Sequence, residues 1–252
     1  MSPLLEARHV SKSFGGVQAL KEVSLTIGAG EIYGLIGPNG AGKTTFFNVL
    51  TGLYPRFAGE VRFAGEALDL GSPHRVAQAG IARTFQNIRL FGNMTARENV
   101  MVGRHPRTRA NVVGAVLRSR ATRDEEAAIR RRADELLRYV GIAHHADAIA
   151  RHLPYGDQRR LEIARALATE PKLLALDEPA AGMNATETEA LKALIEGLRA
   201  DGLTVLLIEH DVKLVMGLCD RVAVLDYGEK IAEDVPAVVR KDAKVIEAYL
   251  GG

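Results

Sequence analysis

The sequence of 252 residues predicts an α/β fold in which a β-rich N-terminal part and an inserted helical part join one parallel sheet. The first observation is a set of continuous apolar runs, which are typical of parallel strands buried on both faces. The second is that helical patterns alternate with these runs, as in βα units. The runs are Leu173–Leu176, Val205–Ile208 and Val222–Leu225, and the helical patterns are Glu187–Leu198 and Asp211–Leu218.

The first third of the chain is predicted to be rich in strands separated by glycine turns. A glycine-rich loop at Gly37–Lys43 is followed by a pattern that indicates a helix through Leu50, stopping near Gly52. Strands are expected at Leu4–His9, Val17–Ile27, Glu31–Ile36, Glu60–Phe63 and Leu68–Leu70, with a strand-like segment at Ile81–Gln86.

The middle of the chain, from about Asn87 to Leu153, is predicted to be helical. Ala127–Val140 repeats apolar residues with a period near 3.6, which indicates an amphipathic helix. We therefore expect a single domain over residues 1–252. Its α/β body comprises residues 1–86 and 171–252, and residues 87–170 form an inserted helical part.

The composition excludes several classes of protein. A formal net charge of +2 argues against a nucleic-acid binder that relies on a broad basic surface. No window contains the ~20 consecutive apolar residues that span a bilayer. Cys219 is the single cysteine, so no intrachain disulfide is possible and a reducing compartment is expected.

The glycine-rich loop carries the pattern GxxxxGK[ST], which is typical of phosphate-binding loops. Its glycines let successive N–H groups point at phosphate oxygens, and the following helix directs its positive end at the same anion. Lys43 is expected to reach the β- and γ-phosphates, and the hydroxyl of Thr44 to ligate Mg²⁺. The sequence therefore predicts a nucleotide site at Gly37, Pro38, Asn39, Gly40, Ala41, Gly42, Lys43 and Thr44.

Two acidic residues follow the apolar run Leu173–Leu176, at the sheet edge where open α/β sheets bind ligands. Asp177 is suited to hold Mg²⁺, and Glu178 is suited to polarise the attacking water as a general base. The alternative is a pair of solvated acids at a strand end. The nearby phosphate loop favours the catalytic interpretation.

Two further polar residues end predicted strands. His210 follows Thr204–Ile208 and is placed to bind the γ-phosphate and position water. Gln86 ends the segment Ile81–Phe85, where its amide can meet Mg²⁺ or the attacking water. Taken alone, a glutamine in this position more often has no catalytic role.

The stretch Leu153–Leu167, here called the signature stretch, decides between classes of nucleotide-binding protein. Phosphate loop, Gln86, signature stretch, acid pair and His210 occur in an order that resembles ATP-binding-cassette (ABC) ATPases over essentially the whole chain. The resemblance implies the P-loop NTPase fold of ABC ATPases, with an N-terminal antiparallel β subdomain and an inserted α-helical subdomain. A small-molecule P-loop kinase would explain neither the signature stretch nor His210.

The resemblance also implies roles for individual residues. Gln86 resembles the Q-loop glutamine and His210 the switch histidine, while Thr45 joins the phosphate-loop residues at the nucleotide. Phe14 takes the place of the aromatic residue that stacks on adenine, although a core phenylalanine is the alternative. Asn184 lies in the D-loop, where the family usually has aspartate. Residues Pro154, Tyr155, Gly156 and Asp157 are implied to contact ATP held by a second subunit.

Three of these residues depart from the common signature LSGGQ. Pro154 replaces serine and removes a hydroxyl, but it presets the chain entering the helix. Tyr155 replaces a glycine, and a tyrosine at this position resembles the signature of the subfamily described next. Asp157 replaces glutamine and suits a helix start, and we expect it to turn toward the ribose hydroxyls.

The segments Ala82–Phe91 and Leu176–Asn184 resemble the ABC subfamily that serves branched-chain amino acid importers. That resemblance implies ATP and Mg²⁺ as cofactors and ATP hydrolysis coupled to transmembrane transport. It implies a second ATPase subunit in a homo- or heterodimer, two integral membrane permease subunits and, indirectly, a periplasmic or extracellular binding protein, with no nucleic acid. The expected location is the cytoplasmic face of the inner (plasma) membrane. The alternatives are ATPases for urea import or lipopolysaccharide export, and a soluble non-transport ABC ATPase.

Two segments are candidates for contact with the membrane complex. Ile88, Leu90, Phe91 and Met94 are apolar and are expected to form a groove for a partner helix, with packing inside the helical part as the alternative. Residues 104–123 contain six arginines and no acid, which favours either an amphipathic element near anionic lipid or the partner, or a solvated helical face. Those arginines are Arg104, Arg107, Arg109, Arg118, Arg120 and Arg123.

Overall fold

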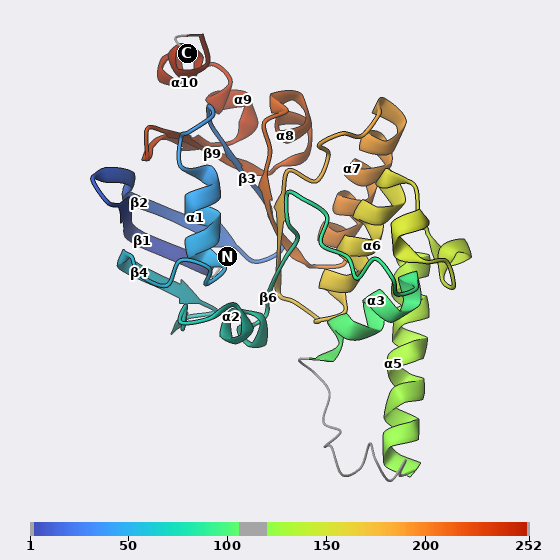
Figure 1. Cartoon of the computed structure of the whole chain (residues 1–252). Helices are drawn as coiled ribbons and strands as arrows, with labels where there is room; N and C mark the ends of the chain where they lie inside the picture. The colour runs from blue at the N-terminus through green and yellow to red at the C-terminus, as the bar shows by residue number, and fades with distance from the viewer. Residues whose placement is uncertain (1–2, 106–119, 251–252) are drawn as a thin grey trace.

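The computed structural model describes residues 3–105 and 120–250, and a six-stranded sheet forms its centre (Figure 1). The strand order is β10-β9-β3-β8-β7-β6, in which only β10 runs antiparallel to its neighbour. The strands are β3 (Ile32–Ile36), β6 (Ile81–Arg83), β7 (Leu173–Asp177), β8 (Thr204–Ile208), β9 (Arg221–Asp226) and β10 (Glu229–Asp234). The parallel strands predicted from the apolar runs are confirmed.

The central strands alternate their side chains between two separate cores. In β3, Ile32 and Ile36 join one apolar cluster, whereas Tyr33 and Leu35 join the other. Every residue of β3, β7 and β8 is buried. This arrangement explains why these strands read as continuous apolar runs, since both faces of the sheet are covered.

Different elements cover the two faces. Helix α1 (Lys43–Leu50) and the β-rich part pack on one face, and α6 (Tyr155–Leu167), α7 (Ala185–Ala200) and α8 (Val212–Leu218) pack on the other (Figure 1). Helix α8 lies so close to β3 that a Cβ on Gly34 would come 2.8 Å from a Val215 methyl group, and 3.0 Å from the sulfur of Cys219, which caps the helix. Cys219 is therefore buried between sheet and helix.

The N-terminal part forms an antiparallel sheet of order β2-β1-β4-β5. Its strands are β1 (Pro3–Phe14), β2 (Val17–Gly28), β4 (Ala58–Phe63) and β5 (Glu66–Ala67). The predicted strand at Leu68–Leu70 is wrong, because the chain leaves the sheet there and Leu70 packs into the core instead. Helix α2 (Pro73–Ala79) follows, and its signals are the Ser72 cap and proline at its first position.

The helical part comprises α3 (Ala96–Gly103), α5 (Arg120–Tyr139), the short helices η2 (Ala143–His145) and η3 (Ala150–His152), and α6. The predicted helix Ala127–Val140 lies almost wholly within α5. Residues 87–95 are not helical, which corrects the expected start of this part, and the strand expected at Ile81–Gln86 ends at Arg83. Arg107, Arg109, Arg118 and residues 112–117 lie outside the described residues, and Arg104 pairs with Glu170.

The chain closes with β10, α9 (Pro236–Val239) and α10 (Ala243–Leu250). Helix α10 lies at the same end of the molecule as β9 (Figure 1). Among residues 3–105 and 120–250, no helix has both the length and the apolar character needed to cross a membrane.

Candidate nucleotide site

The phosphate loop connects β3 to α1, and two of its glycines are required by close backbone packing. Gly37 has a φ of 152°, and a Cβ there would lie 2.1 Å from the carbonyl oxygen of Leu225. Gly42 has a φ of 102° and caps α1, and a Cβ there would lie 2.7 Å from the carbonyl oxygen of Ala19. The backbone of β9 and β2 therefore fixes the curvature of this loop.

Lys43 lies across the loop that precedes it. Its Nζ donates hydrogen bonds to the carbonyl oxygens of Gly37, at 2.6 Å, and Pro38, at 2.8 Å. Burial lowers the pKa of the Lys43 ammonium, while the carboxylates of Glu178 and Asp177 act in the opposite direction. Thr44 and Thr45 continue the first turn of α1 with exposed and half-buried side chains.

Asp177 ends β7 with its carboxylate buried beside Arg83. The Nη2 of Arg83 lies 3.7 Å from an Asp177 oxygen. The Nη1 of Arg83 donates hydrogen bonds to the side chains of Asn48 and Thr51. Burial raises the pKa of Asp177, and Arg83 partly opposes that shift. Arg83 was not predicted to contact Asp177, although it lies in the segment Ala82–Phe91 that resembles the branched-chain amino acid subfamily.

Glu178 is the point where the predicted catalytic residues meet. Gln86 Nε2 donates a hydrogen bond of 2.9 Å to the Glu178 carboxylate, and His210 Nδ1 lies 3.8 Å from the same oxygen. Glu178 has a φ of 47°, which costs energy in a residue with a side chain and recurs at functional sites. Its N–H donates to the Ile208 carbonyl, so β8 holds this backbone in place.

Glu209 is a buried acid that was not among the predicted site residues. One of its carboxylate oxygens accepts a 2.9 Å hydrogen bond from the N–H of Ala180, and the other accepts from the N–H of His210. Burial raises its pKa, and these N–H donors oppose the shift. Glu209 thereby ties the turn that carries His210 to the loop after Glu178.

The donor set fits Mg²⁺. The hydroxyl of Thr44, the carboxylate of Asp177 and the amide oxygen of Gln86 are hard oxygen donors, the type that Mg²⁺ prefers. Gln86 hydrogen-bonds to Glu178, the residue directly after Asp177, so two of the three candidate ligands come from adjoining parts of the sheet edge.

The signature stretch begins α6, with Pro154 as its N-cap and Asp157 in its first turn. Gly156 packs against α7, because a Cβ there would lie 2.7 Å from a carboxylate oxygen of Glu187, which forms a capping box with Asn184. Gly182 faces the ring of Tyr155. The Asp157 carboxylate, expected to turn toward the ribose hydroxyls of a partner's nucleotide, pairs with His145 at 3.3 Å within this chain.

Three charged residues on α6 hold the segment after β6. Arg159 is only 3% exposed and donates to the carbonyl oxygens of Phe85 and Gln86 as well as to the Tyr155 hydroxyl. Glu162, at 1% exposure, accepts from the N–H of Arg89, and Arg165 donates to the Arg89 carbonyl. Burial raises the pKa of Glu162. These residues connect the signature stretch to Gln86.

Phe14 lies at the end of β1 and is 44% exposed, so it is not a core residue. It packs edge-to-face on Tyr54, with ring centroids 5.2 Å apart, and Lys12 Nζ lies 4.9 Å from the Phe14 centroid. Tyr54 and Lys12 were not predicted. Within the described residues, no hydrogen bond or ion pair joins Pro154–Asp157 to the phosphate loop of the same chain.

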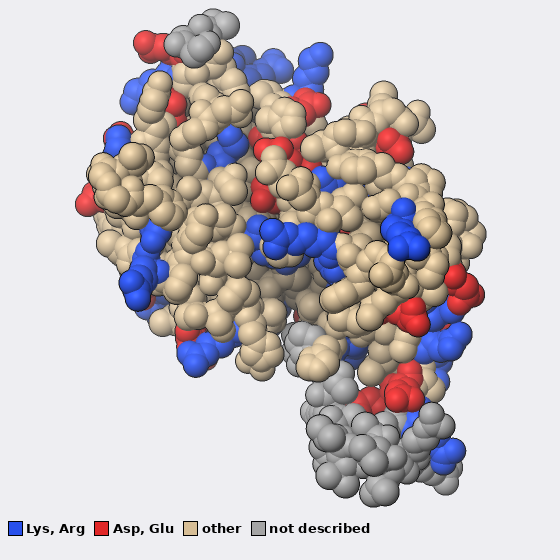
Figure 2. All heavy atoms as spheres, viewed as in Figure 1, with Lys and Arg blue, Asp and Glu red and all other residues tan. Residues whose placement is uncertain are grey.

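Basic and acidic side chains are interspersed on the face shown in Figure 2, as the small net charge leads one to expect. Acidic side chains gather near the middle of this face, with basic side chains directly below them.

The fold and site together define a P-loop ATPase with a signature helix, the architecture of an ATP-binding cassette. A family model described as "ABC transporter" matches residues 20–181, and one described as "Branched-chain amino acid ATP-binding cassette transporter" matches residues 229–252. The chain belongs to the ATP-binding-cassette family of ABC transporters.

Curated relatives and solved structures agree with this assignment. The chain is 44% identical to the high-affinity branched-chain amino acid transport ATP-binding protein BraF of Pseudomonas aeruginosa, and to its LivG counterpart of Escherichia coli K12, covering 99% of this chain and 98% of each relative. It is 37% identical to the E. coli K12 lipopolysaccharide export ATP-binding protein LptB, over 98% of this chain and 97% of the relative. A crystal structure of an ABC transporter cassette in its ADP conformation matches with a TM-score of 0.87, 31% identity and full coverage of both chains.

Proposed function

We propose that this chain is the ATP-hydrolysing subunit of an importer for branched-chain amino acids. The observation that carries the ATPase assignment is the convergence of Gln86 and His210 on Glu178, beside Lys43 and Asp177. The substrate class is supported by the greater identity to the branched-chain amino acid transport proteins, 44% against 37% for the lipopolysaccharide export protein.

In this proposal the phosphate loop Gly37–Thr45 binds the phosphates of ATP and Phe14 stacks on the adenine. Lys43 exchanges its hydrogen bonds to Gly37 and Pro38 for the β- and γ-phosphates. Thr44, Asp177 and Gln86 would hold Mg²⁺, and a bound ion would supply positive charge beside the phosphates.

Hydrolysis requires removal of a proton from the attacking water. Glu178 accepts this proton as general base, with its carboxylate oriented by the Gln86 amide. His210 is more than half exposed and lies at the same carboxylate, so it is free to bind the γ-phosphate. Glu209 positions His210 through its backbone.

A second ATPase subunit completes each site. Pro154, Tyr155, Gly156 and Asp157 lie at the N-terminus of α6, whose positive end favours a phosphate presented by a partner. A dimeric ABC cassette structure matches this chain with a TM-score of 0.78 and 27% identity, over 92% of this chain and 98% of that one. This likeness supports a dimer without choosing between identical and different subunits.

The permeases dock on a groove at the junction of the two parts, on the cytoplasmic face of the membrane. The groove has a volume of about 350 Å³ and is lined by residues of α2, β6, α3 and α6 together with Phe91. Phe91 is 47% exposed, whereas Leu90 packs against the core, so Phe91 is the anchor among the four apolar residues predicted. Residues 87–170 act as the helical subdomain. Helix α6 links this subdomain to Gln86, because Arg159 donates to the Gln86 carbonyl.

Reconstitution tests the proposed function. The chain is assembled with its permeases, a second ATPase subunit and a binding protein in liposomes. We expect leucine, isoleucine or valine with the binding protein to stimulate ATP hydrolysis and to accumulate inside. Stimulation by urea or by lipopolysaccharide, with no response to these amino acids, would refute the substrate class and keep the ATPase assignment.

A further inference from the structure

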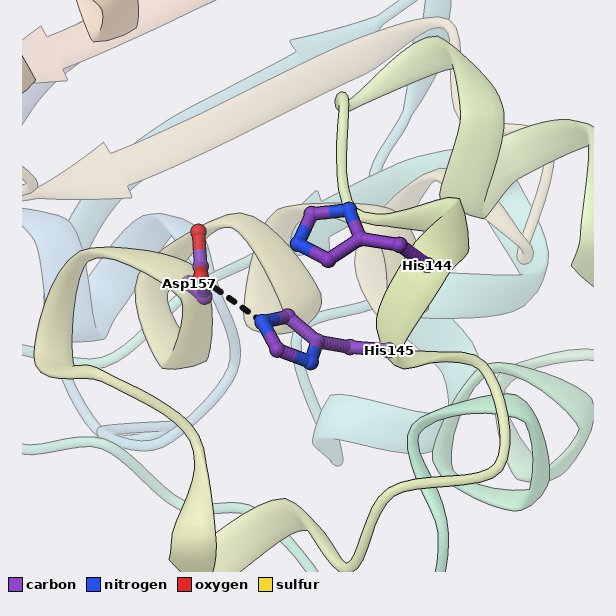
Figure 3. Close-up of side chains that lie close together, drawn as sticks. All are labelled: His144, His145 and Asp157. Atoms are coloured by element: carbon purple, nitrogen blue, oxygen red, sulfur yellow. Dashed lines mark ion pairs between the residues drawn. The ribbon is translucent and has the colours of Figure 1, made fainter.

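A cluster of two histidines and one aspartate lies outside the nucleotide site just described. His144 and His145 come from η2, and Asp157 comes from the first turn of α6. Their ligand atoms all lie within 4.8 Å of one another. The three side chains converge in Figure 3, with the two imidazoles facing the carboxylate across a short gap.

The spacing fits a metal ion. In a tetrahedral zinc site with ligand distances of about 2.0–2.1 Å, two ligand atoms lie about 3.3 Å apart. The Nε2 of His145 and the Oδ2 of Asp157 are 3.3 Å apart. His144 is exposed, so its ring is free to rotate the remaining distance toward the other two atoms.

The donor types decide which ion fits. Imidazole nitrogen suits zinc, copper and nickel, whereas magnesium and calcium prefer oxygen ligands alone. Three protein ligands leave a fourth position for water or another ligand. We propose that His144, His145 and Asp157 form a binding site for a divalent transition-metal ion of the zinc class.

The alternative is an ordinary ion pair between His145 and Asp157 that holds η2 against α6. That alternative gives His144 no part, yet the His144 ring lies with its centroid 4.1 Å from that of His145. Neighbouring residues in a helical turn usually point apart. The approach of both rings to one carboxylate is what a shared ligand explains.

The site has a consequence that rests on the proposed function. Asp157 follows Gly156 in the stretch that covers the partner's ATP, so an ion bound there removes this carboxylate from the nucleotide. Ion binding itself needs neither nucleotide nor partner. A binding test therefore fails or succeeds independently of the ATPase assignment.

Calorimetry with zinc chloride tests the site on the full chain, freed of any affinity tag, of nucleotide and of residual metal. We expect one ion per chain, at least ~10-fold weaker binding in the His144→Ala/His145→Ala double variant, and a similar loss in Asp157→Asn, which keeps the side-chain shape. His74→Ala, which removes an exposed histidine on α2, is the matched control and binds as the unchanged protein does.

Circular dichroism shows whether each variant is folded before it is compared. With Co²⁺ in place of Zn²⁺, we expect visible absorption of a four-coordinate ion in the unchanged protein and its loss in Asp157→Asn. Equal zinc affinity in the unchanged protein and the double variant would overturn the proposal. So would a loss in His74→Ala as large as that in the double variant.

Discussion

The phosphate loop and the signature stretch are held in place by different kinds of interaction. At the phosphate loop, backbone carbonyls of Leu225 and Ala19 press against Gly37 and Gly42, so the absence of side chains fixes the shape. At the signature stretch, Arg159 and Glu162 fix the shape through hydrogen bonds and an ion pair inside the protein. The first arrangement is rigid by packing, whereas the second depends on charge and is the one suited to transmit movement to Gln86.

The largest expected effect lies on the phosphate-loop side. Glu178→Gln removes the general base while keeping the hydrogen-bonding shape, and we expect ATP hydrolysis to fall about 100-fold or more. Steady-state phosphate release by the assembled transporter measures this change. Glu189→Gln, an exposed change on α7, is the control and should leave the rate within about twofold. Full activity in Glu178→Gln would show that another group is the base.

The second prediction tests whether buried charges hold the signature stretch against residues 85–89. Arg159→Met deletes a buried cation and leaves Glu162 with one partner fewer, so we expect a loss of about 3 kcal/mol in the free energy of unfolding. Urea denaturation measures it, and Arg131→Met on the exposed face of α5 is the control. A variant as stable as the unchanged chain would mean that packing alone holds α6 to residues 85–89.

A pH experiment tests the acid at the end of β7. The pKa of Asp177 is raised by burial, so its ionised form destabilises the fold at neutral pH, and stability rises as pH falls through that pKa toward the ordinary value of about 4. At pH 8 the free energy of unfolding of Asp177→Asn is therefore expected to be about 1 kcal/mol higher than that of the unchanged chain. This advantage should shrink at lower pH, and urea denaturation between pH 8 and pH 5 measures it.

One result would contradict the expected gain in stability of Asp177→Asn. If the variant is less stable at pH 8, the ion pair with Arg83 outweighs the cost of burying the carboxylate. Arg83→Gln in the same series then separates the two contributions, because it removes the cation and keeps the acid.

The smallest effect concerns the tyrosine that replaces a glycine of the common signature. Tyr155→Phe removes the hydrogen bond from Arg159, of 2.9 Å, and keeps the ring against Gly182. We expect a loss of about 1 kcal/mol, since a hydrogen bond to a charged group is partly replaced by water. Thermal unfolding measures it, and Tyr227→Phe at an exposed turn is the control.

Motifs with fixed spacing made part of the molecule predictable. The loop Gly37–Lys43, the buried strands and the approach of Gln86 and His210 to Glu178 follow from residue type and from the edge of a parallel sheet. Buried charge was not predictable in the same way. Arg159 and Glu162 have the spacing of an exposed pair on a helix surface, and only the packing of α6 against residues 85–89 buries them.

Short segments were predicted less well for a related reason. The apolar residues Leu68 and Leu70 suggest a strand beside β4, and the Leu68 N–H still donates to the Val61 carbonyl of that strand. The chain then turns away toward Ser72 and α2, so the pairing does not continue. The pairing of Asp157 with His145 likewise depends on a turn twelve residues earlier in the sequence, which no local pattern connects to α6.

The placement of Cys219 behind β3 makes the chain convenient for site-directed labelling. Burial against Gly34 hides its sulfur and raises the pKa of the thiol, so maleimide reagents have little access to the single native cysteine. New cysteines can be introduced at exposed positions without first removing it, for example at Arg131 on α5 and at Glu66 in β5. A spin-label or fluorophore pair at these positions would follow the distance between the helical part and the N-terminal antiparallel sheet through a catalytic cycle.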